Sequence, residues 1–243
     1  MKLLTTTIWA ALLLAVLPLL PGGQAVSAEK IAAVSVFVEG DVTYARAGSE
    51  AYAELKANEL LRPGDSVKTG PGAKASLITK SGAEIRINEN SVLEMPGRKG
   101  MREMFGLAMG QVWSRMLHKR AKLNVRTPAA VCAVRGTEAD IEQRSLLTVK
   151  VYEGHVDLEN ALGKQSLFAG QISTVADPGS APAPARSMTR GEAGNWQEAI
   201  DVKDIGKYLK RVGLSDKNLR VKIAKDGQEK DVDVALKEKS GAK

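Results

Sequence analysis

Few residues of this 243-residue chain combine the types and spacing that catalysis or metal binding requires. Cys132 is the only cysteine, and the only two histidines, His118 and His155, lie far apart in the sequence. A structural zinc site takes about four ligands, mostly Cys and His, so the chain offers too few candidates. Cys132 lies between Val131 and Ala133, a context that favours a buried hydrophobic side chain over a nucleophile. We therefore expect no catalytic residue, no metal and no cofactor.

Basic side chains concentrate in one stretch. Residues 98–126 contain eight Lys or Arg against a single acidic side chain, Glu103. Two solvated loops would explain this pattern. A patch that binds an anionic lipid surface, an acidic glycan or an acidic protein would explain it equally well. Nucleic acid suits the chain less, because aromatic side chains for base stacking are few. The candidate patch residues are Arg115, Lys119, Arg120 and Lys122.

The first 28 residues have the pattern of a secretory signal. Lys2 is their only charged side chain, an apolar run extends from residue 8 to residue 20, and small residues end at Ala28. An uncleaved membrane anchor is the alternative, since a span needs roughly 20 apolar residues. Pro18 and the small-residue exit favour cleavage before Glu29. We expect a soluble periplasmic or secreted protein without a transmembrane anchor.

Short alternating segments separated by Gly and Pro dominate residues 29–176 and predict a mainly β fold of the sandwich, barrel or roll type. The predicted strands are Ile31–Val38, Ala75–Thr79, Ala83–Ile87, Ser91–Met95, Glu138–Glu142, Leu147–Val151, His155–Leu158 and Gln171–Val175.

Residues 177–190 are rich in Pro, Ala and Gly and predict an extended linker. Residues 191–238 predict a small α+β module, with two short helices up to Val212, Gly213 at the helix C′ position, and a hairpin about Asp226-Gly227. A two-residue turn there places Val221 opposite Val232 and Lys222 opposite Asp231. Residues 239–243 are expected to form a disordered tail.

Three motifs occur in a characteristic order. They are Leu61-Arg-Pro-Gly64-Asp65-Ser-Val, then Thr127-Pro128 followed by Val-Arg135-Gly136-Thr137, then Val-Tyr-Glu-Gly154-His-Val. Together they resemble the FecR-type periplasmic domain of iron-uptake signalling proteins. The resemblance implies a twisted antiparallel β roll, similar to a solenoid, and partners in the cell envelope.

In transmembrane members of the family this domain relays the state of an outer-membrane transporter to a sigma factor. The present chain departs from that plan, because only about seven residues precede its hydrophobic stretch. We therefore expect the β-rich scaffold to carry over, and not the relay itself.

The motif residues have a structural explanation. Pro128 lacks a backbone donor and ends a strand there, or marks an edge. Counting back by two from Ala139 places Arg135 on the inward face as a clamp between layers, unless a bulge at Gly136 reverses the alternation.

The sequence favours an exported, non-enzymatic binding and scaffold protein with protein partners in the cell envelope. A peptidoglycan, acidic-glycan or lipid-surface binding module that uses residues 98–126 is the second hypothesis, and an unrecognised hydrolase is the third.

Overall fold

The computed structural model describes residues 30–97, 104–118, 121–214, 219–225 and 228–234. In these ranges fifteen strands form one sheet and two form a hairpin, which confirms the mainly β fold predicted from the alternating segments. One α-helix, α1 (Ile205–Arg211), and one 3-10 helix, η1 (Trp196–Ala199), follow the large sheet. The predicted signal, residues 1–28, lies outside the described residues. None of the described helices has the length and apolar character of a membrane span.

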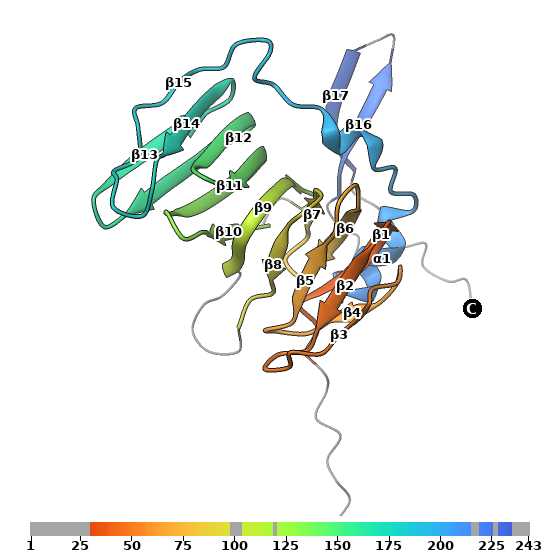
Figure 1. Cartoon of the computed structure of the whole chain (residues 1–243). Coiled ribbons are helices and arrows are strands. Elements are labelled where there is room, and N and C mark those ends of the chain that lie inside the picture. The colour runs from red at the N-terminus through yellow and green to blue at the C-terminus, as the bar shows by residue number, and fades with distance from the viewer. Residues whose placement is uncertain (1–29, 98–103, 119–120, 215–218, 226–227, 235–243) are drawn as a thin grey trace, which may run out of the picture.

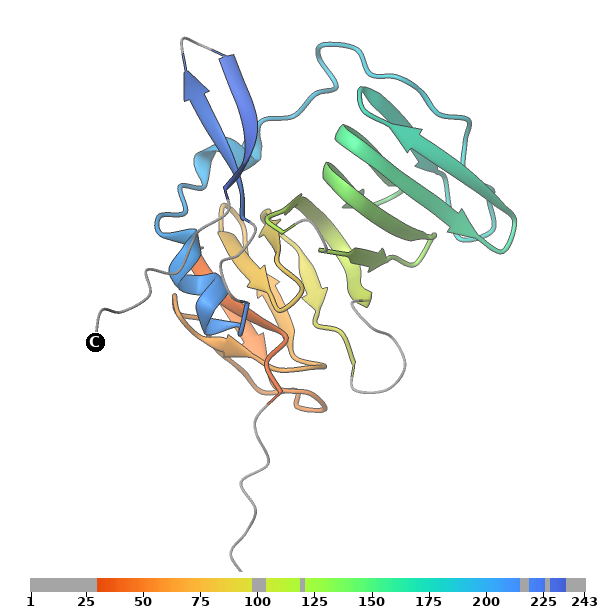
Figure 2. The same ribbon diagram turned by 180° about the vertical axis from the view of Figure 1, so that it is seen from behind.

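The first nine strands along the described part of the chain curl into a small barrel (Figures 1 and 2). They are β1 (Ala33–Glu39), β2 (Val42–Ala45), β3 (Tyr52–Glu54), β4 (Leu60–Leu61), β5 (Ser66–Thr69), β6 (Lys74–Thr79), β7 (Ala83–Ile87), β8 (Val92–Glu94) and β9 (Met104–Met116). β1 pairs with β4 and β6, β6 with β7, and β2 with β3 and β5. β7 and β8 pair with successive parts of β9, and β8 also pairs with β5, which curls the sheet back toward its start.

The sheet continues beyond β9 as a stack of strands. These are β10 (Leu123–Arg126), β11 (Val131–Gln143), β12 (Leu147–Asn160), β13 (Gly163–Phe168), β14 (Gln171–Val175) and β15 (Arg186–Ser187). All of the registered pairs are antiparallel except β9 with β10. β13 and β14 both pair with β12, one along each half of that strand. The predicted twisted antiparallel roll is thus the main architecture, with one parallel pair inside it.

Glycines with positive φ bend the three longest strands. Gly110 in β9, Gly136 in β11 and Gly154 in β12 have φ values of 101°, 66° and 70°. Side chains other than glycine disfavour this left-handed region. The β11–β12 register shifts between Arg135 and Glu138 and again between Glu138 and Ala139, so Gly136 lies in a bulge close to Gly154. These bends let one strand contribute to two differently oriented parts of the sheet.

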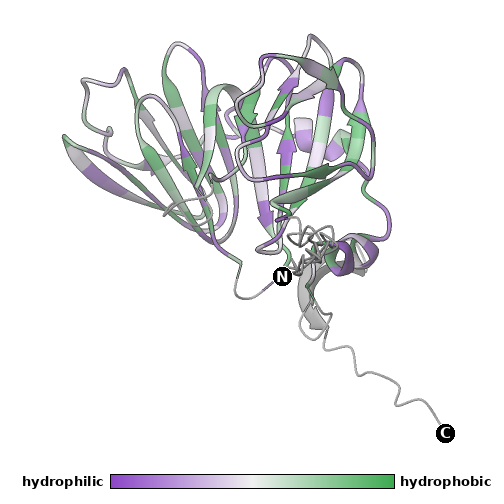
Figure 3. Cartoon of the chain, turned by 90° about the horizontal axis from the view of Figure 1, so that it is seen from below, coloured by the Kyte–Doolittle hydropathy of each residue, from purple (hydrophilic) through white to green (hydrophobic). Residues whose placement is uncertain are grey.

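Both parts of the sheet share one core. Its buried side chains are mostly Val, Leu, Ile and Ala, as the composition predicts, and they extend from Ala33 in β1 to Val175 in β14. Hydrophobic and hydrophilic positions alternate along many of the strands (Figure 3). Cys132 is completely buried in this core, and burial raises the pKa of its thiol to about 12. The interpretation of Cys132 as a buried hydrophobic residue is therefore confirmed.

The Pro-rich segment after β14 runs along the edge of the sheet. Ala183 N–H donates to Thr174 O at 2.9 Å, and Ser173 Oγ donates to Ala183 O at 2.6 Å. Pro182 and Pro184 flank Ala183 and have no backbone N–H to offer another strand. Proline at an exposed edge is a known device against edge-to-edge aggregation. The segment predicted as a linker is therefore also the edge of the sheet.

A C-terminal strap, residues 195–214, covers part of the outside of the barrel (Figures 1 and 2). Leu209 and Val212 pack on Val34, Val36 and other side chains to form a second, smaller core. The helix begins at Ile205 after Asp204, and Asp204 makes no side-chain capping bond. Gly213 has a φ of 84°, and its N–H donates to Lys210 O, which agrees with the predicted C′ position.

The hairpin is formed by β16 (Leu219–Lys225) and β17 (Gln228–Val234). Its register pairs Val221 with Val232 and Lys222 with Asp231, which confirms the register predicted from the Asp226-Gly227 turn. The two turn residues themselves lie outside the described residues.

A row of polar side chains crosses the outer face of the sheet beneath the strap. Successive cross-strand pairs join Ser76 to Arg86, Arg86 to Trp113, Trp113 to Asp140, and Asp140 to Lys150. The strap contacts this row at two places: Trp196 Nε1 donates to Asp140 Oδ2 at 2.9 Å, and Arg86 donates to Gln197 O at 2.5 Å. The strap therefore combines a small apolar core with buried polar contacts.

Asp140 is expected to make the stability of the protein depend on pH. Burial raises the pKa of its carboxyl group, and bonds donated by Gln111 and Trp196 only partly oppose this. Lys150 also lowers this pKa, whereas Glu142 raises it. A raised folded-state pKa means that folding favours the protonated form, so this contribution to stability is lost as pH rises through that pKa. It is complete below the unfolded value of about 3.9.

The free energy of unfolding of the wild type, minus that of Asp140→Asn, should therefore increase as pH falls from 7 toward 4. Urea titrations of both proteins at several pH values measure this difference. Glu54→Gln provides the control, because the side chain of Glu54 is 75% exposed and Glu54 is not among the groups that shift the pKa of Asp140. Parallel curves for the wild type and Asp140→Asn would contradict the expectation.

Candidate functional site

A groove of about 380 Å³ opens where two of the predicted motifs meet. The Gly64 turn lies on one side and Thr127-Pro128 on the other, with parts of β8 and β9 between them. Tyr52 adds an apolar wall and is 47% exposed. Residues that are more than sixty positions apart in the sequence are thus brought to one surface.

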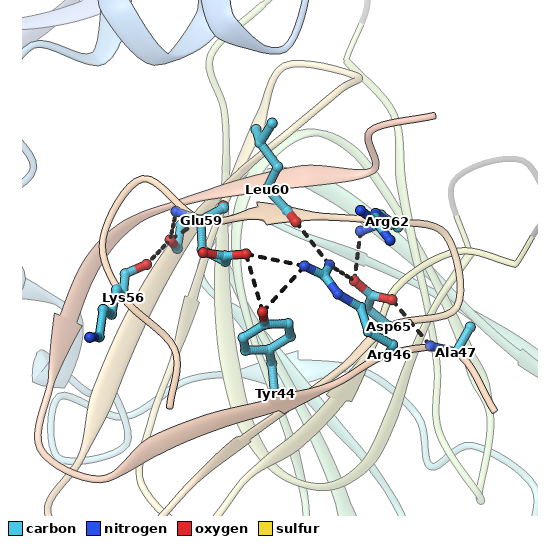
Figure 4. A network of polar contacts seen from close by, with 9 residues as sticks. Tyr44, Arg46, Ala47, Lys56, Glu59, Leu60, Arg62 and Asp65 are labelled. Carbon is cyan, nitrogen blue, oxygen red and sulfur yellow. Dashed lines mark hydrogen bonds and ion pairs between the residues drawn. The ribbon is translucent and has the colours of Figure 1, made fainter. Parts of the chain in front are cut away.

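Asp65 holds the first wall in place (Figure 4). Its side chain is 1% exposed and accepts hydrogen bonds from Arg46 Nη1 at 2.7 Å, Arg62 N at 2.8 Å and Ala47 N at 3.2 Å. These bonds tie the Gly64 turn to the end of β2. A buried carboxylate needs this kind of compensation, because its desolvation is otherwise costly.

Arg46 connects Asp65 to a wider network (Figure 4). Its guanidinium also donates to Leu60 O, Tyr44 Oη and Glu59 Oε1 at 3.1 to 3.2 Å. Burial alone would lower the pKa of Arg46, but the hydrogen bond and charge of Asp65 raise it above its ordinary value. Arg46 therefore stays charged beside the groove and is already neutralised by its acidic neighbours.

Replacing Asp65 with asparagine should destabilise the protein by about 3 kcal/mol, because the amide NH2 group cannot accept a hydrogen bond. If the NH2 group replaces Oδ2, the bonds from Arg46 and Arg62 are lost, and if it replaces Oδ1, the bond from Ala47 is lost. Chemical denaturation measures the loss. Glu54→Gln is the matched control, since Glu54 is 75% exposed and pairs with an equally exposed Lys56. That change should stay within about 0.5 kcal/mol. Equal stabilities of the two variants would contradict the role assigned to Asp65.

Thr127 and Pro128 form the opposite wall by ending β10. Thr127 Oγ1 accepts hydrogen bonds from the N–H groups of Ala129 and Ala130 at 3.2 Å, and Thr127 N–H donates to Ala130 O. This closed turn leads from β10 into β11. β10 ends at Arg126, two residues before Pro128.

The floor of the groove is made of small residues on β9. Gly106 and Ala108 line it, together with part of Leu107, and Glu94 on β8 lies beside them. A Cβ atom added to Gly106 would meet Glu94 Cβ at 3.4 Å, an ordinary contact distance, and the φ of Gly106 lies outside the left-handed region. The floor is therefore shallow, uncrowded and able to admit another chain closely.

The remaining signature residues lie in the β11–β12 bulge. Arg135 is exposed, with 59% of its side chain accessible and its Nε 3.4 Å from Asp157 Oδ2. The prediction of an inward clamp at Arg135 is therefore wrong, because the bulge at Gly136 reverses the alternation. Thr137 continues β11 after this bulge, and Gly154 lies across from it in β12.

The predicted basic patch does not form as a set of four surface cations. Arg115 turns toward the polar row, where its Nη2 donates to Glu84 Oε2 at 2.7 Å and its side chain is 23% exposed. Lys122 is exposed, and Lys119 and Arg120 lie outside the described residues. The prediction that Arg115 belongs to a surface patch is therefore wrong, because its cross-strand neighbour Glu84 draws it inward.

The side chains that line the groove are polar as well as apolar. Ser49, Ser66 and Thr127 supply hydroxyl groups, but the lining residues that the structure describes include no histidine to act as a general base. Over the same described part of the chain, no three His, Cys, Asp or Glu side chains converge on a point that suits a metal ion.

Sequence reasoning did not find several residues of this site. Arg46, Tyr52 and Glu94 belong to no motif, and nothing in their spacing relates them to Asp65 or Thr127. The motifs did mark the two turns that form the walls. Turn residues are recognisable from Gly and Pro, whereas the long-range pairing that brings turns together is not.

Comparison with known proteins agrees with the domain predicted from the motifs. Residues 65–157 match the family model described as FecR protein. The resemblance to the FecR-type domain is therefore confirmed over that region, which extends from the Asp65 turn through most of β12.

Two crystal structures of a candidate anti-sigma factor from Parabacteroides distasonis ATCC 8503 are also similar to this chain, at 15% and 16% sequence identity. Each of the two matches has a TM-score of 0.44 and covers 50% of this chain and 59% of the solved chain. The chain thus spans about three fifths of the solved proteins' length. No curated protein matches the sequence.

Proposed function

We propose that the chain is an exported, non-enzymatic binding and scaffold protein of the cell envelope, which contacts other envelope proteins through the groove and acts in envelope signalling. One observation carries this proposal: two turns of the FecR-type motif form the walls of the same groove. The lining from Ser66 to Pro128 falls inside the family match. The part of the chain most typical of the family is therefore also the part that builds a binding surface.

A protein partner is favoured over an anionic glycan or lipid surface. Electrostatic retention needs several exposed cations on one face. Arg115 is paired with Glu84 in the polar row, and Arg46 is paired with Asp65 and Glu59. The groove combines apolar side chains with an arginine whose charge is already paired, and this combination fits a protein surface better.

Chemical cross-linking in intact cells tests the proposal. We expect tagged wild-type protein to be cross-linked to specific envelope proteins, and Ala108→Trp, which fills the groove, to lose at least 90% of that product, as a roughly tenfold loss of affinity implies. Ser187→Trp is the control, because Ser187 is exposed on β15 at the far edge of the sheet. Equal cross-linking by all three proteins would refute the assignment of the groove.

Export is tested separately by intact-mass analysis of cell fractions. The mature chain should begin at or near Glu29 and be recovered with the soluble envelope proteins, because signal cleavage follows small residues such as those ending at Ala28. A full-length chain that retains Met1 in the membrane pellet would contradict this expectation.

A further inference from the structure

The strand ladder along β9 has a gap beside the groove. On one side of β9, β8 pairs with Gly106 to Met109 and β7 with Val112 to Met116. On the other side, β10 pairs with Met104 to Gly106, and β11 pairs from Gly110 onward. Among the described residues, Leu107, Ala108 and Met109 have no partner strand on that second side. β10 ends too early to cover them because Thr127 and Pro128 turn the chain away.

Backbone groups in such a gap need partners. Each residue carries one N–H and one C=O, and nearly all of these groups in folded proteins are paired with protein or water. Strands on both sides of the gap already hold β9 in extended geometry. A segment that enters there would therefore meet a preformed strand edge. Mainly the segment, and not β9, would lose conformational entropy on binding.

We propose that the groove binds an extended segment of a partner protein, which adds to β9 as a short strand at Leu107–Met109. This inference rests on the proposed function and specifies how the groove recognises its partner. Strand addition is a recurring mode of peptide recognition, in which main-chain hydrogen bonds give affinity and side-chain pockets give specificity. The gap of three residues corresponds to about 10 Å of strand.

The surroundings of the gap indicate the side chains that the segment carries. Gly106 and Ala108 allow close approach of a backbone beside them, and a small side chain at the facing position of the segment keeps this approach close. Tyr52 and Met109 are large hydrophobic residues with exposed fractions of 47% and 48%. Tyr52 lines the groove and Met109 follows Ala108 in β9, so both can cover apolar side chains at neighbouring positions of the segment. The partner is thus an extended peptide with a small residue between apolar ones.

Peptide selection provides the test. A displayed library of random decapeptides is selected on the whole purified protein, and the tightest peptides are resynthesised with a fluorophore for anisotropy titration. We expect Gly106→Leu to weaken their binding at least tenfold, because the added side chain occupies the floor. Ala108→Trp gives the same readout from an exposed position if Gly106→Leu lowers the melting temperature. Ser187→Leu, on the exposed strand β15 at the far edge of the sheet, should bind like the wild type.

N-methylation of the selected peptides separates strand addition from other binding modes. Methyl groups on the amides that face β9 should weaken binding at least tenfold, whereas methyl groups on the alternate amides, which face away, should change it less than threefold. Failure to select any peptide would overturn the proposal. Binding by Gly106→Leu and Ala108→Trp that is as tight as binding by the wild type would also overturn it. Groove-dependent binding that tolerates both methylation patterns would overturn strand addition but leave the proposed function intact. Loss of the cellular cross-links in Ser187→Trp as well as in Ala108→Trp would instead count against the proposed function.

Discussion

Replacing Glu84 with alanine should lower the free energy of unfolding by about 3 to 5 kcal/mol, the range observed when one partner of a buried ion pair is removed. Glu84 is completely buried although it lies on the outer face of β7. It accepts bonds from Arg86 Nε and Arg115 Nη2, both at 2.7 Å, and from Ser76 Oγ at 3.1 Å. Without the carboxylate, two guanidinium groups that are only 10% and 23% exposed would face each other uncompensated.

The effect should extend to the strap. Arg86 and Arg115 lie on the ring of Trp113, with 4.8 and 5.7 Å between guanidinium carbon and ring centre, and Arg86 also holds Gln197 O. Chemical denaturation measures the stability, and the double variant Glu84→Ala/Arg115→Met measures the coupling. Removing Glu84 together with Arg115 should cost less than removing Glu84 alone. A double variant that is less stable than Glu84→Ala by the full cost of Arg115→Met would show that the two residues do not interact.

Gly110→Ala should destabilise the fold by more than about 4 kcal/mol or prevent folding, because it combines backbone strain with a clash in a close-packed interior. The φ of Gly110 is 101°, and an added Cβ would lie 2.2 Å from Ser91 Oγ and 2.4 Å from Ser91 Cα. Ser91 is itself buried and accepts a bond from Gln111 N–H at 3.0 Å. Expression in soluble form, followed by thermal and urea unfolding, measures the effect.

Gly136→Ala is the matched control, because Gly136 also has positive φ but open space where its Cβ would be placed. The left-handed conformation alone should cost about 1 to 2 kcal/mol there. Adding Ser91→Gly to Gly110→Ala should not rescue the fold, since the contact with Ser91 Cα stays. A Gly110→Ala protein as stable as Gly136→Ala would show that β9 can shift away from Ser91.

Local patterns in the sequence predicted the elements better than their arrangement. Alternation located most of the longer strands, and complementary pairs such as Lys222 with Asp231 predicted the hairpin register. The short strands β3, β4 and β15 have only two or three residues and leave no periodic signal. The long-range pairing of β9 with four different strands depends on glycine bends whose direction no local pattern reveals.

Burial of charged residues was the main limit on predicting the site. Glu84 and Arg86 alternate with apolar Ala83 and Ile85, a pattern typical of one solvated face. They are buried only because a strap more than one hundred residues later covers that face. Arg135 shows the opposite error, since a single bulged residue moved it from the expected core to the surface.

The small core between β1 and α1 also determines when folding can finish. Val34 and Leu209 are 175 positions apart, and both belong to this core. The amino-terminal part of the chain emerges first, whether from the ribosome or from an export channel, so one apolar face of β1 stays uncovered until the residues up to Val212 have emerged. Contacts between such distant segments slow folding, and exposed apolar surface in the meantime attracts chaperones and proteases. A chain interrupted before the strap would be recognised as unfinished and degraded.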